Sequence, residues 1–137
     1  MTEEQRRLVQ MSFAKLVPKS EYAATLFYKR FFELAPEVEQ LFKSDLNTQG
    51  IKLFQVISFA VLSLDNLDEL LPVIQDLGRR HVQYGAMDSH YIHVGNALLW
   101  TIEEVLKEDY TPDVKAAWTD LYKLLASAMR TAVTPVD

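Results

Sequence analysis

The sequence predicts an all-α protein, on three observations. Apolar residues recur with helical spacing along nearly the whole chain. Glycine is scarce, with four among 137 residues, and no two-residue turn separates alternating runs, so β-hairpins are not expected. Prolines and polar capping residues divide the periodic stretches into segments of helix length. We therefore expect about six long helices, one short helix and short connectors.

The first predicted helix begins at the capping-box pattern Thr2-Glu3-Glu4-Gln5 and ends at Pro18. A second helix is expected from about Ser20. Pro36 breaks that helix and starts a short helical turn, which ends at Leu41-Phe42.

A polar loop over residues 43–48 precedes the most apolar helix, which is expected to begin at Gln49. Asp65-Asn66 ends this helix and caps the next, which runs to about His81. A connector then leads to a long helix over about 89–107.

Thr111 and Pro112 form an N-cap and first helical position for the last helix, and residues 134–137 are expected to fray. A plain helical bundle and a sandwich of steeply crossing helices around a pocket both fit this pattern.

Composition limits the possible functions. The 137 residues are 49% apolar, which suits one domain, 1–137, with a real core. The net charge of −5 disfavours nucleic acid as a partner. The absence of cysteine excludes disulfides, thiolate zinc sites and thioether-linked cofactors. No signal-peptide core or membrane-length apolar stretch is present, so we expect a soluble cytoplasmic protein without a membrane partner.

His81 is the first candidate for metal or cofactor chemistry. It lies near the predicted end of a helix, in Leu77-Gly78-Arg79-Arg80-His81, and a single imidazole can hold a haem iron. An isolated histidine at a helix end is also a common surface residue, so its own segment does not decide between these readings.

The residues around His81 form an ordered set. Tyr28 precedes Pro36 and Phe42, and Gln49 and Leu53 lie one turn apart on one helix face. Further matching stretches are Leu77 to His81, Tyr91 to Val94-Gly95 to Leu98-Leu99, and Thr111-Pro112 to Trp118 to Leu121-Tyr122. At these points the chain resembles the globin family, particularly bacterial single-domain globins and neuroglobin-like proteins, over essentially its whole length.

The resemblance implies a globin fold, a three-on-three helical sandwich around a pocket for haem b (iron protoporphyrin IX). It makes His81 the proximal iron ligand and places Phe42 flat on the porphyrin. Tyr28, Gln49 and Leu53 would form the distal pocket that faces a bound gas. Lys52 and Arg80 would meet the haem propionates. The expected lining of the macrocycle is Ile57, Leu77, Tyr91, Val94 and Leu98.

Each assignment has a simpler alternative. Tyr28 also fits a core tyrosine, Gln49 an exposed helix start, and Lys52 and Arg80 ordinary solvated charges. His90 and His93 flank Tyr91, and we expect them at the surface although a propionate could attract either.

Two departures from the family pattern affect the expected chemistry. Most oxygen-storage globins have a distal histidine where this chain has Gln49, so water or Tyr28 stays open as a sixth ligand. Flavin-linked globins carry a reductase domain and a glutamate on the last helix, at a position that matches Val133 here. We expect neither the reductase domain nor this glutamate here, and both absences weaken the case for a self-sufficient enzyme.

The leading hypothesis is reversible binding of oxygen, or of carbon monoxide or nitric oxide, to the haem. Tyr28 and Gln49 as hydrogen-bond donors suggest slow oxygen release, which favours scavenging or sensing over oxygen transport. An alternative is nitric oxide dioxygenase activity with an external reductase. A gas or redox sensor and a haem-free interaction module are further alternatives.

Overall fold

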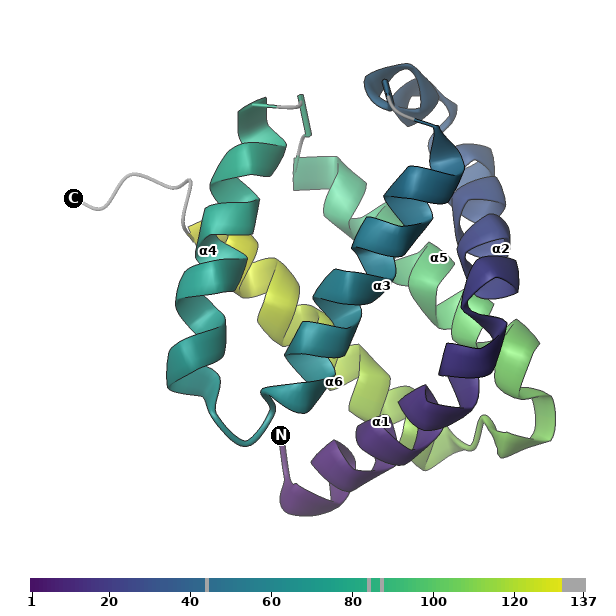
Figure 1. Cartoon of the computed structure of the whole chain (residues 1–137), viewed down its shortest axis with the longest axis vertical. Coiled ribbons are helices and arrows are strands. Elements are labelled where there is room, and N and C mark those ends of the chain that lie inside the picture. Colours follow the sequence, from purple (N-terminus) through teal and green to yellow (C-terminus); the bar gives the residue numbers. More distant parts are fainter. Residues whose placement is uncertain (44, 84, 87, 132–137) are drawn as a thin grey trace.

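A computed structural model of the chain describes residues 1–43, 45–83, 85–86 and 88–131 (Figure 1). Over these residues it contains only helices, which confirms the all-α prediction. Their order is α1 (Glu3–Leu16), η1 (Val17–Lys19), α2 (Ser20–Leu34), η2 (Pro36–Leu41), α3 (Leu46–Leu62), α4 (Leu67–Gln83), α5 (Asp88–Leu106), η3 (Lys107–Asp109) and α6 (Pro112–Thr131), where η denotes a 3₁₀ helix. None of the helices in the described residues combines the length and the apolar character that crossing a membrane requires.

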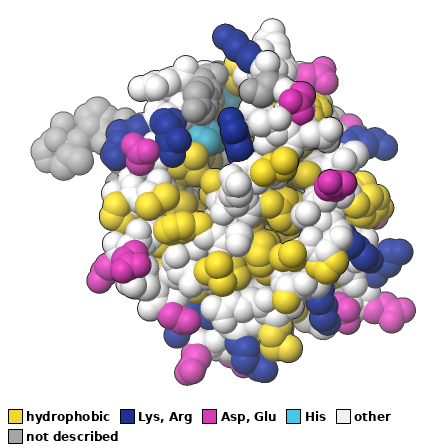
Figure 2. All heavy atoms as spheres, in the orientation of Figure 1, with side chains coloured by type: hydrophobic (Ala, Val, Ile, Leu, Met, Phe, Trp, Pro, Cys, Tyr) yellow, Lys and Arg dark blue, Asp and Glu magenta, His cyan; other side chains and the backbone are white. Residues whose placement is uncertain are grey.

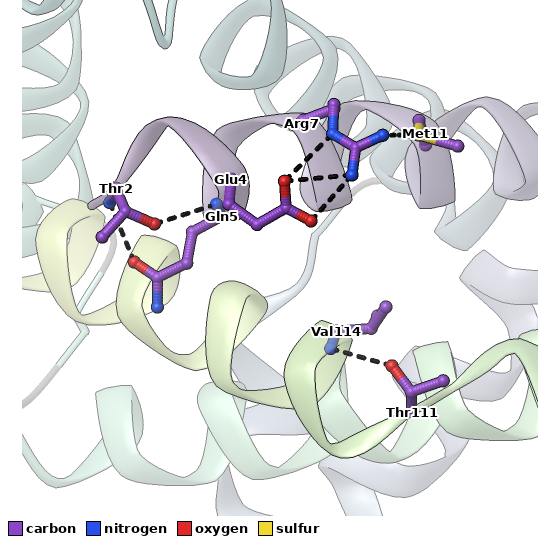
Figure 3. A network of polar contacts seen from close by, with 7 residues as sticks. All are labelled: Thr2, Glu4, Gln5, Arg7, Met11, Thr111 and Val114. Atoms are coloured by element: carbon purple, nitrogen blue, oxygen red, sulfur yellow. Dashed lines mark hydrogen bonds and ion pairs between the residues drawn. The ribbon is translucent and has the colours of Figure 1, made fainter.

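The starts of α1 and α6 follow the capping signals of the sequence (Figure 3). The Gln5 amide donates a hydrogen bond to Thr2 Oγ1, and the Thr2 amide donates one to Gln5 Oε1, both at 3.0 Å. The Val114 amide donates to Thr111 Oγ1 at 3.2 Å. These caps pair amides that the first helical turn leaves without partners, and they therefore fix where both helices begin.

The two helices that frame the candidate site are longer than predicted. α3 begins at Leu46 instead of Gln49, because the Thr48 amide donates a hydrogen bond of 2.9 Å to Asp45, which caps the helix. α4 continues past His81 to Gln83. Gln49 and His81 thus both lie within regular helix, where the backbone fixes the direction of their side chains.

The helices form two crossing layers, with α1, α3 and α4 on one side and α2, α5 and α6 on the other (Figure 1). α4 packs chiefly on α6, whereas α2 packs on both α3 and α5. This arrangement is the predicted sandwich and excludes a plain bundle of aligned helices.

Two glycines lie at close helix crossings. A Cβ added at Gly50 of α3 would lie 2.9 Å from Cβ of Ala24 in α2. One added at Gly78 of α4 would lie 2.3 Å from the carbonyl oxygen of Met129 in α6. Because real Cβ atoms do not come this close to other atoms, only glycine allows α3 to approach α2, and α4 to approach α6, as they do.

α3 and α4 share an apolar core at one end only, near the turn that connects them. There Ala60 of α3 packs with Leu70 and Ile74 of α4. Toward the other ends of α3 and α4, the described residues form no apolar cluster that joins the two helices. The helices therefore diverge from this shared core. The side chains near their far ends are the candidates for a functional site.

A buried hydrogen bond ties the first helix to the last across the main core. Trp118 Nε1 of α6 donates to Ser12 Oγ of α1 at 2.8 Å, and the Ser12 hydroxyl donates to the Leu8 carbonyl at 2.7 Å. Both side chains are buried, so the bond gives the indole N–H a partner that water cannot supply there.

Candidate functional site

One wall of the candidate site is a cluster around Tyr28 of α2. The Tyr28 ring meets the Phe42 ring edge to face, with centroids 5.4 Å apart. Leu53 of α3 and Val94 and Leu98 of α5 pack against the same cluster and are only partly buried. The fold thus brings together five residues that the sequence placed in one pocket, from four separate segments of the chain.

The hydroxyl of Tyr28 is the notable polar group in this wall. The side chain is only 6% exposed, yet none of the described residues accepts a hydrogen bond from it. Burial raises the pKa of Tyr28 to about 12, because the apolar surroundings disfavour the phenolate. The phenol therefore keeps its proton at neutral pH and can donate a hydrogen bond to a bound molecule.

The other predicted residues of α3 lie at different depths. Gln49 is half-buried in the first turn of the helix, and its side chain forms no hydrogen bond with the described residues, including Tyr28. Lys52 is exposed. Ile57 is buried in the largest apolar cluster of the described residues, which includes Phe13 and Trp118. Leu53 and Leu98 pack against this cluster.

His81 lies in the last turn of α4 with its ring half-buried. Its Nδ1 lies 2.9 Å from the carbonyl oxygen of Leu77. A carbonyl can only accept, so Nδ1 carries the hydrogen and donates it, which leaves Nε2 of the neutral ring without a proton. Burial lowers the pKa of His81, with a smaller lowering from the Arg80 charge, while the bond to Leu77 opposes both. The neutral ring with an unprotonated Nε2 is the form that ligates metals.

The residues beside His81 separate into apolar and charged positions. Leu77 is half-buried but packs in none of the apolar clusters that the described residues form. Arg80 is exposed and forms an ion pair of 3.2 Å with Asp76 of the same helix. On the face of the molecule that Figure 2 shows, a histidine side chain lies near the upper end, between Lys and Arg side chains and above apolar ones. The face thus combines an imidazole, cations and uncovered apolar surface.

Tyr91 lies in the first turn of α5 and is held by α6. Its backbone carbonyl accepts a hydrogen bond of 2.5 Å from the Tyr122 hydroxyl. The guanidinium of Arg130 lies over its ring, 5.8 Å from the centroid. The Tyr91 ring is therefore fixed from the α6 side.

The structure corrects the expectation for His90. This residue is only 7% exposed rather than at the surface, because the start of α5 lies beside η2, whose Glu37 Oε1 is 3.9 Å from His90 Nε2. His93 is half-buried. Val133 lies outside the described residues.

Sequence reasoning missed one pair beside the site. Arg130 of α6 donates two hydrogen bonds to the Asp88 carboxylate of α5, at 3.0 and 2.9 Å. The partners are 42 residues apart. Only the folded arrangement brings them together, and no local pattern in the sequence marks the pair.

Comparisons with known proteins find relatives over most of this chain. The family model described as Globin matches residues 25–129. A flavohemoprotein of Bacillus subtilis is 33% identical over 105 residues, which cover 74% of this chain. This chain spans only 26% of the length of that flavohemoprotein. Neuroglobin-1 of Oncorhynchus mykiss is 28% identical, with 94% of this chain and 90% of the relative covered.

A solved structure matches nearly the whole chain. It is an engineered carbene transferase, described as a putative nitric oxide dioxygenase from Rhodothermus marinus. It superposes with a TM-score of 0.85 at 30% sequence identity, with 96% of this chain and 92% of that chain covered.

Proposed function

The chain belongs to the globin family, and from this premise we propose that it holds a b-type haem between α3, α4 and the start of α5 and binds a diatomic gas there reversibly. The observation that carries the proposal is His81, a half-buried imidazole whose proton is committed to Nδ1 by the Leu77 carbonyl. When bound, the haem would supply an iron with one coordination position open to oxygen, carbon monoxide or nitric oxide.

His81 is the residue we assign as the protein ligand of the iron, through Nε2. Its hydrogen bond to Leu77 orients the ring and makes the imidazole a better electron donor. The lowered pKa of His81 keeps the ring neutral, so the ligand does not have to lose a proton before it binds.

The partly buried apolar residues of α3, α4 and α5 suit a large, flat, apolar group. Leu53, Val94 and Leu98 are partly buried on one side, and Leu77 is partly buried on the other without a cluster of its own. Phe42, Ile57 and Tyr91 would complete the lining. Such a lining with few polar groups is what a cofactor of this kind requires. Lys52 and Arg80 are exposed cations that would meet its carboxylates at the rim.

Tyr28 is the group we assign to the gas-binding side, with Gln49 as a second donor. The Tyr28 hydroxyl is protonated, belongs to a buried side chain and has no acceptor among the described residues, so a bound gas with negative charge on its outer atom would receive its hydrogen bond. Such a bond is stronger in a dry pocket than in water. It would retain oxygen more than carbon monoxide, which favours scavenging or sensing of oxygen over its transport.

A second candidate is nitric oxide dioxygenase activity, which the description of the matching solved structure favours. In this reaction nitric oxide, dioxygen and one electron give nitrate. The electron would come from a separate reductase. Consumption of many equivalents of nitric oxide with such a reductase supports this candidate, whereas a single stoichiometric event contradicts it.

Absorption spectra of the ferric, ferrous and carbonmonoxy protein test the leading proposal. The wild type purified with added haem should show a Soret band that carbon monoxide shifts, and acid butanone should extract the haem because the chain has no cysteine to retain it. His81→Ala should lose most of the band and regain it with added imidazole, while His93→Ala should retain it. A wild type without a Soret band would contradict haem binding and favour an interaction module. Undiminished haem binding by His81→Ala would contradict the ligand assignment alone.

A further inference from the structure

One short stretch of α6 supports both helices that follow α3. Met129 lies against Gly78 of α4, where an added Cβ would be 2.3 Å from the Met129 carbonyl oxygen. The next residue, Arg130, contacts the first turn of α5. α6 therefore sets the position of α4, which carries His81, and of the α5 start, which carries Tyr91.

Arg130 makes two kinds of contact with that first turn. Its Nε and one terminal nitrogen donate to the two carboxylate oxygens of Asp88, at 3.0 and 2.9 Å. The same guanidinium lies over the Tyr91 ring at 5.8 Å from its centroid. A planar guanidinium can form this forked ion pair and stack on a ring at once, and a lysine ammonium cannot.

Tyr122 of α6 makes two further contacts with the start of α5. Its hydroxyl donates to the Tyr91 carbonyl, and its ring packs so closely on Gly95 that an added Cβ there would lie 2.6 Å from Tyr122 Cε2. We call Asp88, Tyr91, Tyr122 and Arg130 the α5 clamp. All of its contacts act on residues 88–95, the first two turns of α5, which include Val94.

We propose that Arg130 is a positioning residue for the haem site: the α5 clamp fixes the spacing between His81 and the wall formed by Tyr91 and Val94. This inference rests on the proposed function. An exposed ion pair alone contributes little to stability. Here the pair shares one guanidinium with a ring contact and joins the start of α5 to the stretch of α6 that packs on α4. Its loss therefore acts on the spacing between His81 and the start of α5.

Variants of both partners test the clamp. Arg130→Gln and Asp88→Asn remove the ion pair, the double variant measures their coupling, and Arg130→Lys retains only the charge. Lys15→Gln is a matched control, because Lys15–Asp109 is another exposed pair between two elements, at 3.2 Å. Three measurements are needed: amide hydrogen exchange of residues 88–95 in the haem-free protein, transfer of haem to an excess of a haem-accepting protein, and the iron–histidine stretching band of the ferrous protein.

Arg130→Gln and Asp88→Asn should each speed exchange at residues 88–95 and haem loss by about three- to tenfold. The double variant should be no worse than either single one, Arg130→Lys should be intermediate, and the iron–histidine band should shift or broaden. Lys15→Gln should leave all three measurements at wild-type values.

Two outcomes would overturn the positioning role. In the first outcome, Arg130→Gln loses haem at the wild-type rate and keeps an unchanged iron–histidine band, even if its amide exchange is faster. The other is an equal effect of Lys15→Gln. A wild type that shows a Soret band alongside either outcome refutes the positioning role alone. A wild type without a Soret band refutes the proposed function itself, and haem-free exchange then still measures how firmly the clamp holds α5.

Discussion

At the scale of single residues, Tyr28 and His81 owe their chemistry to burial. Burial holds the pKa of Tyr28 near 12 and lowers the pKa of His81, so the phenol stays protonated and the imidazole stays neutral. The Leu77 carbonyl then determines which imidazole nitrogen carries the proton. One residue is thereby prepared as a hydrogen-bond donor and the other as an electron-pair donor before any ligand is present.

Removal of the Tyr28 hydroxyl should speed oxygen release. A single hydrogen bond contributes about 1 kcal/mol or somewhat more, so Tyr28→Phe should raise the oxygen dissociation rate by about five- to tenfold. Stopped-flow displacement of oxygen by carbon monoxide measures this rate. Tyr22→Phe is the control, because Tyr22 lies on the same helix with its side chain 57% exposed. An unchanged rate in Tyr28→Phe would remove the hydroxyl from the mechanism.

The raised pKa of Tyr28 also predicts alkaline sensitivity. The unfolded chain loses this proton near pH 10, whereas the folded protein keeps it until about pH 12, so stability is complete below pH 10 and falls as pH rises toward 12. At pH 11 the loss from this one group is about 1 kcal/mol. Urea unfolding at pH 8 and pH 11 should show a smaller pH effect in Tyr28→Phe than in the wild type. Equal effects in the two proteins would mean that Tyr28 titrates normally.

The residues of the site were predictable to different degrees. Tyr28, Phe42 and Leu53 could be proposed because their spacing follows an ordered family pattern, and the fold brings them together. The buried state of His90 depends on the approach of η2 to the start of α5, and the Asp88–Arg130 pair depends on two helices meeting. Neither leaves a periodic or local signal in the chain.

At the scale of elements, two glycines determine how closely α3 and α4 approach their partner helices. Gly50 allows α3 to lie close to α2, and Gly78 allows α4 to lie close to α6. The two helices share a core near their connecting turn and then separate, since each is packed on a different partner. The divergence of α3 from α4 is thus a result of the positions of Gly50 and Gly78.

Gly78→Ala should reverse the usual effect of this substitution. In an unobstructed helix, alanine is more stable than glycine by about 0.5–1 kcal/mol. Here the new Cβ would meet the Met129 backbone, so we expect a destabilisation of about 1–3 kcal/mol, together with faster haem loss as α4 shifts. Chemical denaturation measures the first effect, with Arg79→Ala on the exposed face of α4 as control. A stabilised Gly78→Ala protein would show that the crossing is looser than described.

Element identities were predictable where capping chemistry is local. Thr2 and Gln5 form their capping box within one turn, and Thr111 with Pro112 marks the start of α6. The start of α3 was predicted too late, because Asp45 lies in a polar stretch in which several residues could serve as the cap. The choice between bundle and sandwich depends on crossing contacts such as Gly50 with Ala24, which helical periodicity does not encode.

At the scale of the whole molecule, α6 is the common partner of α1, α4 and α5. It joins α1 through the buried bond from Trp118 to Ser12, and it supports α4 and α5 through residues near Arg130. Stability of the whole chain and geometry of the candidate site therefore depend on the same helix.

Ser12→Ala should destabilise the entire fold. The variant leaves the indole N–H of Trp118 buried without its acceptor, which costs about 1–3 kcal/mol. Thermal and urea unfolding should both report this loss. Thr25→Ala is the matched control, since the Thr25 hydroxyl also donates to the helix carbonyl four residues earlier but is exposed, and its removal should change stability by less than about 0.5 kcal/mol. Equal losses in both variants would show that the buried bond has no special weight.

The position of α6 in the chain also determines when the protein can fold during its synthesis. A ribosome makes α4 and the start of α5 before Met129 and Arg130, the residues that support them. Until α6 emerges, the faces of α1, α4 and α5 that pack on it have no partner and are exposed to chaperones and to aggregation. If the chain binds haem as proposed, the haem would bind only after α6 has left the ribosome and has packed on α4 and α5.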